Sequence, residues 1–162
     1  MAQNYKIETC RDSKLFENWG EYEIEFDIKL TSRIYAWRNL FRVNFGPKKD
    51  DFTGPALWMG NKGFYFWQKA RGKDVLFKSR IYRVKEWIHV KLVHKQLDDK
   101  KAFWKVTIDG PEKDEYYHPY SGKVVKVEKA LFFMAEPKSW NIGSLGGYAE
   151  VKNLKITNLA NM

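Results

Sequence analysis

The sequence has little of what marks a disulfide-bonded, His-dependent or membrane-spanning protein. It holds one Cys and three His in 162 residues. An internal disulfide needs two thiols, so Cys10 is interpreted as a small buried or terminal side chain rather than a nucleophile. No stretch approaches about 18 apolar residues, so no transmembrane helix is expected. The first fourteen residues lack the apolar core of a signal peptide, which fits either a cytosolic protein or a mature chain behind a start Met.

The amino-acid composition of the chain favours β-sheet. It contains 7 Trp, 9 Tyr and 11 Phe, and 44% of its residues are hydrophobic. Aromatic and β-branched residues favour strands, and no segment has a convincing helical period. About nine to eleven short strands, with no internal repeat and no linker, predict an all-β, two-sheet antiparallel jelly-roll sandwich. We expect a single domain over residues 1–162, with its core at about 15–159.

Residues 87–110 give the strongest strand signal, because two alternating runs flank the polar turn Asp98-Asp99-Lys100. The pattern predicts a β-hairpin whose core-facing side chains include Trp104, Val106 and Ile108. His89 and His94 are five residues apart, so they are expected on opposite faces of their strand and make poor joint metal ligands.

Other segments are assigned by the same periodicity. Residues 21–30 alternate between acidic or basic and apolar side chains, and 60–63 (Gly-Asn-Lys-Gly) predict a tight turn between two aromatic strands. In 40–45, Phe41, Val43 and Phe45 alternate with Leu40, Arg42 and Asn44. A missed step between Val151 and Leu154 predicts a bulge. The charged, Tyr-rich residues 111–122 are expected to form a loop.

Five motifs occur in an order that resembles the laminin-G-like, concanavalin-type jelly rolls. They are GEYEIEFDIKLTS (20–32), AWRNLFRVNF (36–45), GPALW (54–58), WIHVKL (87–92) with a partner strand ending in Ile-Asp-Gly (108–110), and GYAEVKNLKI (147–156). The chain is similar in particular to compact modules of marine-invertebrate secreted and skeletal matrix proteins, except that Gly54 stands where those modules usually carry an Arg. The resemblance implies ligand sites on the concave face or rim loops, a secreted or cell-surface location, and glycan or protein partners, often with calcium.

The net charge of +9, from 29 Lys and Arg against 20 Asp and Glu, favours anionic partners. Nucleic acid, acidic lipid headgroups and sulfated or uronic glycans all qualify. The basic residues are spread along the chain and no recognised nucleic-acid motif is present, so nucleic acid is ranked below the other ligands.

The predicted function is a non-enzymatic, lectin-like binding module that recognises a glycan or other anionic ligand. Aromatic rings would stack on sugar faces while Lys, Arg and Asn donate hydrogen bonds to hydroxyl, carboxylate or sulfate oxygens. No catalytic residue and no metal ligand is predicted. The candidate ligand-binding residues are Trp58, Lys62, Tyr65, Trp67, Arg71, Arg42, Asn44, His89, Lys91, Phe103 and Lys105.

Three alternatives stay open. The first is a carrier of an apolar small molecule such as a lipid, retinoid or carotenoid, in a pocket lined by Met59, Phe64, Phe66, Phe132, Phe133 and Met134. The second is a glycoside hydrolase that uses Glu23, Glu25 and Asp27, whose side chains recur about every 6.6 Å along one strand face. The third is a structural homo-oligomer. Calcium could bind at residues 50–51 or 98–99, where Asp pairs occur, although Asp is also common in turns.

Overall fold

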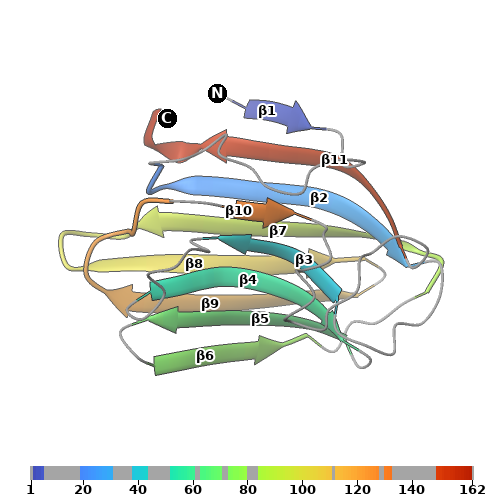
Figure 1. Cartoon of the computed structure of the whole chain (residues 1–162), viewed down its shortest axis with the longest axis horizontal. Coiled ribbons are helices and arrows are strands. Elements are labelled where there is room, and N and C mark those ends of the chain that lie inside the picture. Colours follow the sequence, from blue (N-terminus) through green and yellow to red (C-terminus); the bar gives the residue numbers. More distant parts are fainter. Residues whose placement is uncertain are drawn as a thin grey trace.

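The computed structural model describes residues 2–5, 19–30, 38–43, 52–60, 63–70, 73–79, 84–110, 112–127, 130–132 and 149–161. In this part of the chain the strands form two antiparallel sheets, which lie one behind the other in Figure 1. The strands are β1 Ala2–Tyr5, β2 Tyr22–Leu30, β3 Arg38–Val43, β4 Phe52–Gly60, β5 Gly63–Ala70, β6 Lys73–Lys78, β7 Trp87–Gln96, β8 Lys101–Asp109, β9 Lys113–Ser121, β10 Ala130–Phe132 and β11 Ala149–Asn158, and a 3-10 turn, η2 Leu159–Asn161, follows.

The six-stranded sheet has the order β1-β11-β2-β7-β8-β9, and the five-stranded sheet has the order β10-β3-β4-β5-β6. The predicted all-β sandwich is confirmed. Strand β2 pairs with β7 and β11, which lie far from it in sequence, rather than with β3. Strands β9 and β6 form edges of their sheets, and Figure 1 places both at the bottom of the view.

The core lies between the sheets because each strand buries one side chain in two. Along β2, β7 and β8, buried and half-buried residues alternate without a break. The predicted core positions Trp104, Val106 and Ile108 are fully buried. Ring contacts join the two layers: Phe26 meets Phe41 edge-on at 6.3 Å between centroids, and Phe66 lies 6.1 Å from Trp104.

The expectation of a loop at 111–122 is wrong, because nine of these residues form the edge strand β9. Its sequence, KDEYYHPYS, alternates half-buried and exposed positions, so Tyr116 and Tyr120 turn toward the core while Tyr117 and Pro119 face outward. Pro lacks a backbone N–H and is tolerated on an edge strand. High polarity and a Pro masked a period-two pattern in the sequence.

Of the three register shifts in the described strands, one lies between Thr53 and Ala56, where β4 pairs with β5, and the other two bear on the sequence patterns. The predicted one lies in β11, where pairing with β2 shifts between Lys152 and Lys155 and Asn153 has a φ of 58°. The other lies in β3, between Asn39 and Phe41. At this shift Leu40 and its neighbour Phe41 are both buried, although the sequence pattern sets them on alternate positions. Phe45 and Asn44 lie outside the described residues.

Candidate functional site

The candidate ligand-binding residues fall on two opposite outer faces of the sandwich. Those on the five-stranded sheet are Trp58, Tyr65 and Trp67, and those on the six-stranded sheet are His89, Lys91, Phe103 and Lys105. Packed sheets lie about 10 Å apart with the core between them. One small ligand therefore cannot contact both groups, and the predicted set divides into two candidate surfaces.

The first surface, the aromatic face, consists of Trp58, Tyr65, Trp67 and Lys78. Strand alternation turns these residues outward, because their neighbours Leu57, Met59, Phe64 and Phe66 are fully buried in the core. Trp58 pairs with Tyr65 across β4 and β5, and Tyr65 pairs with Lys78 across β5 and β6. The three rings therefore lie together, with Trp67 two residues beyond Tyr65 on β5.

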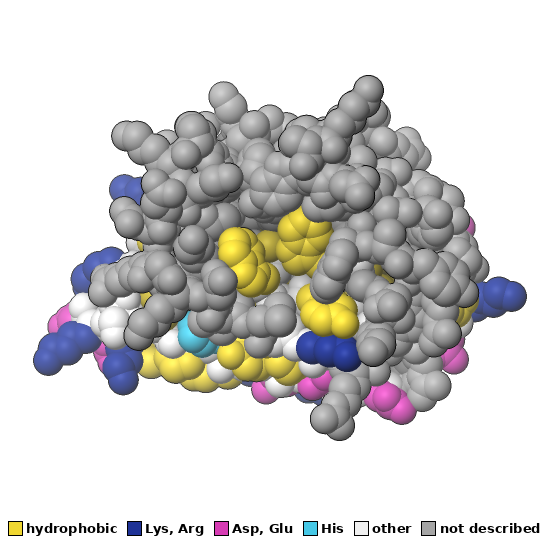
Figure 2. All heavy atoms as spheres, turned by 60° about the horizontal axis from the view of Figure 1, so that its bottom comes forward, with side chains coloured by type: hydrophobic (Ala, Val, Ile, Leu, Met, Phe, Trp, Pro, Cys, Tyr) yellow, Lys and Arg dark blue, Asp and Glu magenta, His cyan; other side chains and the backbone are white. Residues whose placement is uncertain are grey.

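The rings of the aromatic face are half-buried, and Lys78 is exposed. Its Nζ lies 5.7 Å from the centroid of the Tyr65 ring, in the range of a cation–π contact. Figure 2 shows hydrophobic side chains in a recess of the surface, with a Lys or Arg side chain against one of them. This combination of flat apolar rings and a basic group suits a ligand that has both an apolar face and negative charge.

Register places Arg42 near this face. Its backbone pairs with Ala56, which in turn pairs with Trp67, so the three share one cross-strand row. Lys62, Arg71 and Asn44 lie outside the described residues. Sequence reasoning missed Lys78. The signal was that Lys78 directly follows Phe77 in a strand, where adjacent residues face opposite sides. In the structure Phe77 is half-buried against the core and Lys78 is exposed.

Charge is distributed unevenly between the two sheets. The strands of the five-stranded sheet carry five Lys or Arg and one Asp. The strands of the six-stranded sheet carry eight Lys and seven Asp or Glu. The strand framework of the aromatic face is thus the more positive of the two, which favours anions on that side.

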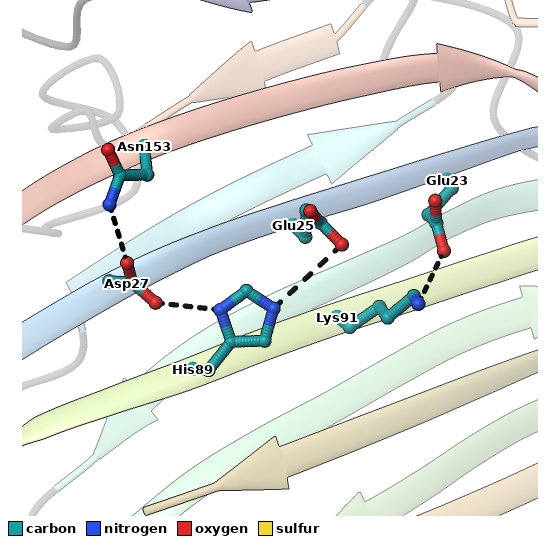
Figure 3. A network of polar contacts seen from close by, with 6 residues as sticks. All are labelled: Glu23, Glu25, Asp27, His89, Lys91 and Asn153. Carbon is teal, nitrogen blue, oxygen red and sulfur yellow. Dashed lines mark hydrogen bonds and ion pairs between the residues drawn. The ribbon is translucent and has the colours of Figure 1, made fainter. Parts of the chain in front are cut away.

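On the outer face of the six-stranded sheet the acidic row of β2 is matched by basic residues of β7 (Figure 3). Glu23 accepts from Lys91 Nζ at 2.9 Å. Asp27 Oδ1 lies 2.6 Å from His89 Nδ1, and Glu25 Oε2 lies 3.8 Å from His89 Nε2. The β2–β7 register, which sets Asp27 opposite His89, brings these partners together.

Asn153, at the β11 bulge, adds to this network by donating to Asp27 Oδ2 at 2.8 Å. Partial burial by itself raises the pKa of Asp27, but hydrogen bonds from Asn153 and His89, with the charges of His89 and Lys152, outweigh it and leave that pKa below its usual value. The pKa of Lys91 is raised, chiefly by its hydrogen bond to Glu23. A general acid needs a raised carboxyl pKa, so these surroundings do not suit Asp27 to that role.

His94 lies on the opposite, inner face of β7, as predicted from its spacing to His89. Its Nδ1 lies 3.0 Å from the backbone oxygen of Gly20, and its Nε2 lies 2.5 Å from the hydroxyl of Tyr120. Nδ1–H therefore donates to Gly20, and Nε2 accepts from the Tyr120 O–H. Burial lowers the pKa of His94 to about 4 and raises that of Tyr120. This buried pair joins β7, β9 and the chain before β2.

The remaining candidates have structural surroundings. Asp98 Oδ1 accepts the backbone N–H groups of Lys100 and Lys101 at 2.8 Å each, which is a turn-forming role. Asp50 and Asp51 lie outside the described residues, and within those residues no three His, Cys, Asp or Glu side chains gather as a metal site. Of the candidate pocket residues, Met59, Phe64 and Phe66 are core, only the backbone of Phe132 is described, and Phe133 and Met134 fall in a part that is not.

Solved structures of other β-sandwich proteins are similar to this chain. An endo-β-1,4-glucuronan lyase from the fungus Trichoderma reesei has a TM-score of 0.56 at 14% identity, over 97% of this chain and 79% of that one. A marine PL-14 alginate lyase from Aplysia kurodai has a TM-score of 0.52 at 12% identity, over 91% and 73%. The CBM40 module of the Ruminococcus gnavus IT-sialidase, bound to α2,3-sialyllactose, has a TM-score of 0.51 at 12% identity, over 97% and 89%.

No family model matches the chain, and a comparison with curated proteins found no match. The structural likeness therefore places the chain among sandwich-type, jelly-roll-like modules and defines its fold. Within the described residues, no helix is long and apolar enough to cross a membrane.

Proposed function

We propose that this protein is a non-enzymatic module that binds an anionic glycan, carboxylated or sulfated, on the aromatic face. The observation that carries the proposal is the cross-strand row Trp58–Tyr65–Lys78, with Trp67 beside it on the outer side of the more basic sheet. Sugar rings have apolar C–H faces that stack on aromatic side chains, and Lys and Arg would pair with the acidic groups.

The neighbouring folds support the same ligand class. The three similar structures act on or bind glucuronan, alginate and sialyllactose, all of which carry carboxylates. The chain's net charge of +9 suits such polymers. We further propose a secreted or cell-surface location, where ligands of this kind are met.

The test is binding of the purified protein to a panel of neutral, uronic and sulfated glycans, followed by titration with the best ligand. Trp67→Ala and Lys78→Ala are each expected to weaken binding about tenfold, and the wild-type affinity should fall as salt rises because exposed charges are screened. The matched control is Trp87→Ala. Trp87 is exposed on the other sheet, and the amino groups of Lys152 and Lys29 lie 3.8 and 5.0 Å from its ring centroid, over its faces.

Two results would overturn the proposal: no binding to any acidic glycan in the panel, or equal losses for Trp87→Ala and Trp67→Ala. Catalysis is tested on the same ligands. Incubation with alginate and glucuronan is expected to produce no new chain ends, and turnover that disappears with a substitution on the aromatic face would make the protein an enzyme instead.

A further inference from the structure

A second cluster of rings and Lys residues lies on the outer face of the six-stranded sheet. We call it the Phe103 patch and define it as Lys95, Lys101, Phe103, Lys105, Tyr117 and Pro119, from β7, β8 and β9. Register makes it continuous, because Phe103 pairs with Lys95 on one side and with Pro119 on the other, while Lys105 pairs with Tyr117. Lys101 precedes Phe103 by two residues and so faces the same way.

The rings of the patch form an exposed apolar step. Tyr117 is 47% exposed, and its ring centroid lies 5.1 Å from that of Phe103 with the planes tilted by 35°. Pro119 is exposed beside them. The step borders the β9 edge, whose outer side pairs with no strand among the described residues. Apolar side chains that gather on a surface in this way are found at interaction sites.

Two of the three Lys residues of the patch lack the close carboxylate partner that Lys29 and Lys91 have on the same face. Near β2, Lys91 and Lys29 each have a carboxylate within 2.9 Å. In the patch, Lys105 has a looser contact with Glu115 at 3.5 Å, and across the described residues neither Lys95 nor Lys101 has a carboxylate in ion-pairing distance. The charges of this face are therefore segregated, with an excess of positive charge around the rings.

We propose that the Phe103 patch is a second binding site for an anionic polysaccharide, so that one molecule cross-links two polysaccharide chains. The ligand class is argued from charge complementarity and ring exposure, and it rests on the proposed function because both sites take the same polymer. The two sites lie on opposite faces of the sandwich with the core between them. One polymer segment cannot lie across both faces at once, whereas two chains can be held together.

The experiment measures cross-linking and simple binding separately. Alginate-coated beads are mixed with the protein, and aggregation is followed by turbidity, while binding to a single immobilised alginate layer is measured in parallel. The patch variant combines Lys95→Ala, Lys101→Ala and Tyr117→Ala, and the aromatic-face variant combines Trp67→Ala and Lys78→Ala. The control variant combines Lys113→Ala and Lys152→Ala, which removes two exposed Lys from the same outer face outside the patch.

The wild-type and control proteins are expected to aggregate the beads. The patch and aromatic-face variants are each expected still to bind the layer through the site that remains, yet to need at least about tenfold more protein for aggregation. If the patch variant aggregates beads like wild type, the inference is wrong even though the proposed function stands. If the patch variant loses all binding while the aromatic-face variant loses none, the patch is the single site and the proposed function is misplaced.

Two further measurements keep the result decisive. If the triple variant proves unstable in urea, the double variant Lys95→Glu with Lys101→Glu takes its place. This charge reversal leaves the rings in place and should abolish aggregation. A dimer with one site per protomer could also cross-link beads. In that case the aromatic-face variant would lose both aggregation and all binding, and this result would overturn the inference. Displacement of alginate from the patch by single-stranded DNA at lower concentration than by alginate itself would also overturn it.

Discussion

Acid should destabilise this protein well above the range in which its carboxylates titrate, because His94 is buried without charge. The perturbation is a change from pH 8 to pH 5. Burial lowers the pKa of His94 from its ordinary 6.5 to about 4, although its hydrogen bond to Gly20 opposes the shift. Between pH 6.5 and 4 the unfolded chain therefore binds a proton at His94 that the folded chain does not bind. The contribution of neutral His94 to the free energy of unfolding is fully present above pH 6.5 and is lost as the pH falls toward 4.

The two pKa values set the size of the effect. Full protonation of the folded His94 would cost about 3 kcal/mol relative to the unfolded chain, of which about 2 kcal/mol is lost between pH 8 and pH 5. The half-buried His118 also has a lowered pKa, through burial, and acts in the same direction. A comparison with a variant is therefore needed to isolate His94.

The assay is urea unfolding at several pH values for wild type and His94→Gln. The variant should be less stable at pH 8, by about 1–2 kcal/mol, because the hydrogen bond from Tyr120 is disturbed. Its pH dependence between 8 and 5 should be shallower than that of wild type by about 2 kcal/mol. A wild-type stability that is flat over this range, or a variant that keeps the full loss, would refute the reasoning.

Three further substitutions and one matched control test the packing and the surface by urea unfolding. Trp104→Ala removes a fully buried ring that packs against Phe66, Tyr116 and His118, and should cost about 3–5 kcal/mol; a loss below about 1 kcal/mol would contradict its core position. Gly20→Ala places a Cβ 2.6 Å from Val124 Cγ2 and should cost about 1–3 kcal/mol, more than the matched Gly110→Ala, whose Cβ would lie 3.1 Å from Ile88 Cγ1. Glu23→Gln breaks the half-exposed ion pair with Lys91 and should cost less than about 1 kcal/mol, so a loss above about 2 kcal/mol would show that the pair is more important than its exposure suggests.

Several features of the fold and the site could be read from periodicity. Residues 22–30 and 87–109 alternate so regularly that their buried faces, including Trp104, and the opposed directions of His89 and His94 followed from the sequence. The turn at 60–63 and the bulge near Asn153 followed from Gly and Asn chemistry and from a break in the pattern.

Other features depended on which strands meet. Strand β9 was missed because its alternation is carried by Tyr and His rather than by aliphatic residues. Its inner face is defined only in the folded chain, where Tyr116 contacts Phe77 of β6 and Trp104 of β8. Lys78 joined the aromatic face only through its pairing with Tyr65.

The sequence by itself determined which side of each regular strand is buried, because a strand exposes every second side chain and the buried half must be apolar. Only the tertiary structure decided which outer face each candidate residue occupies. Trp67 and Phe103 look equivalent in the sequence, as outward aromatics among basic residues, yet they lie on opposite sheets. Period-two patterning sets the face of a strand, whereas long-range pairing assigns the strand to a sheet, and that assignment separates one predicted surface into two.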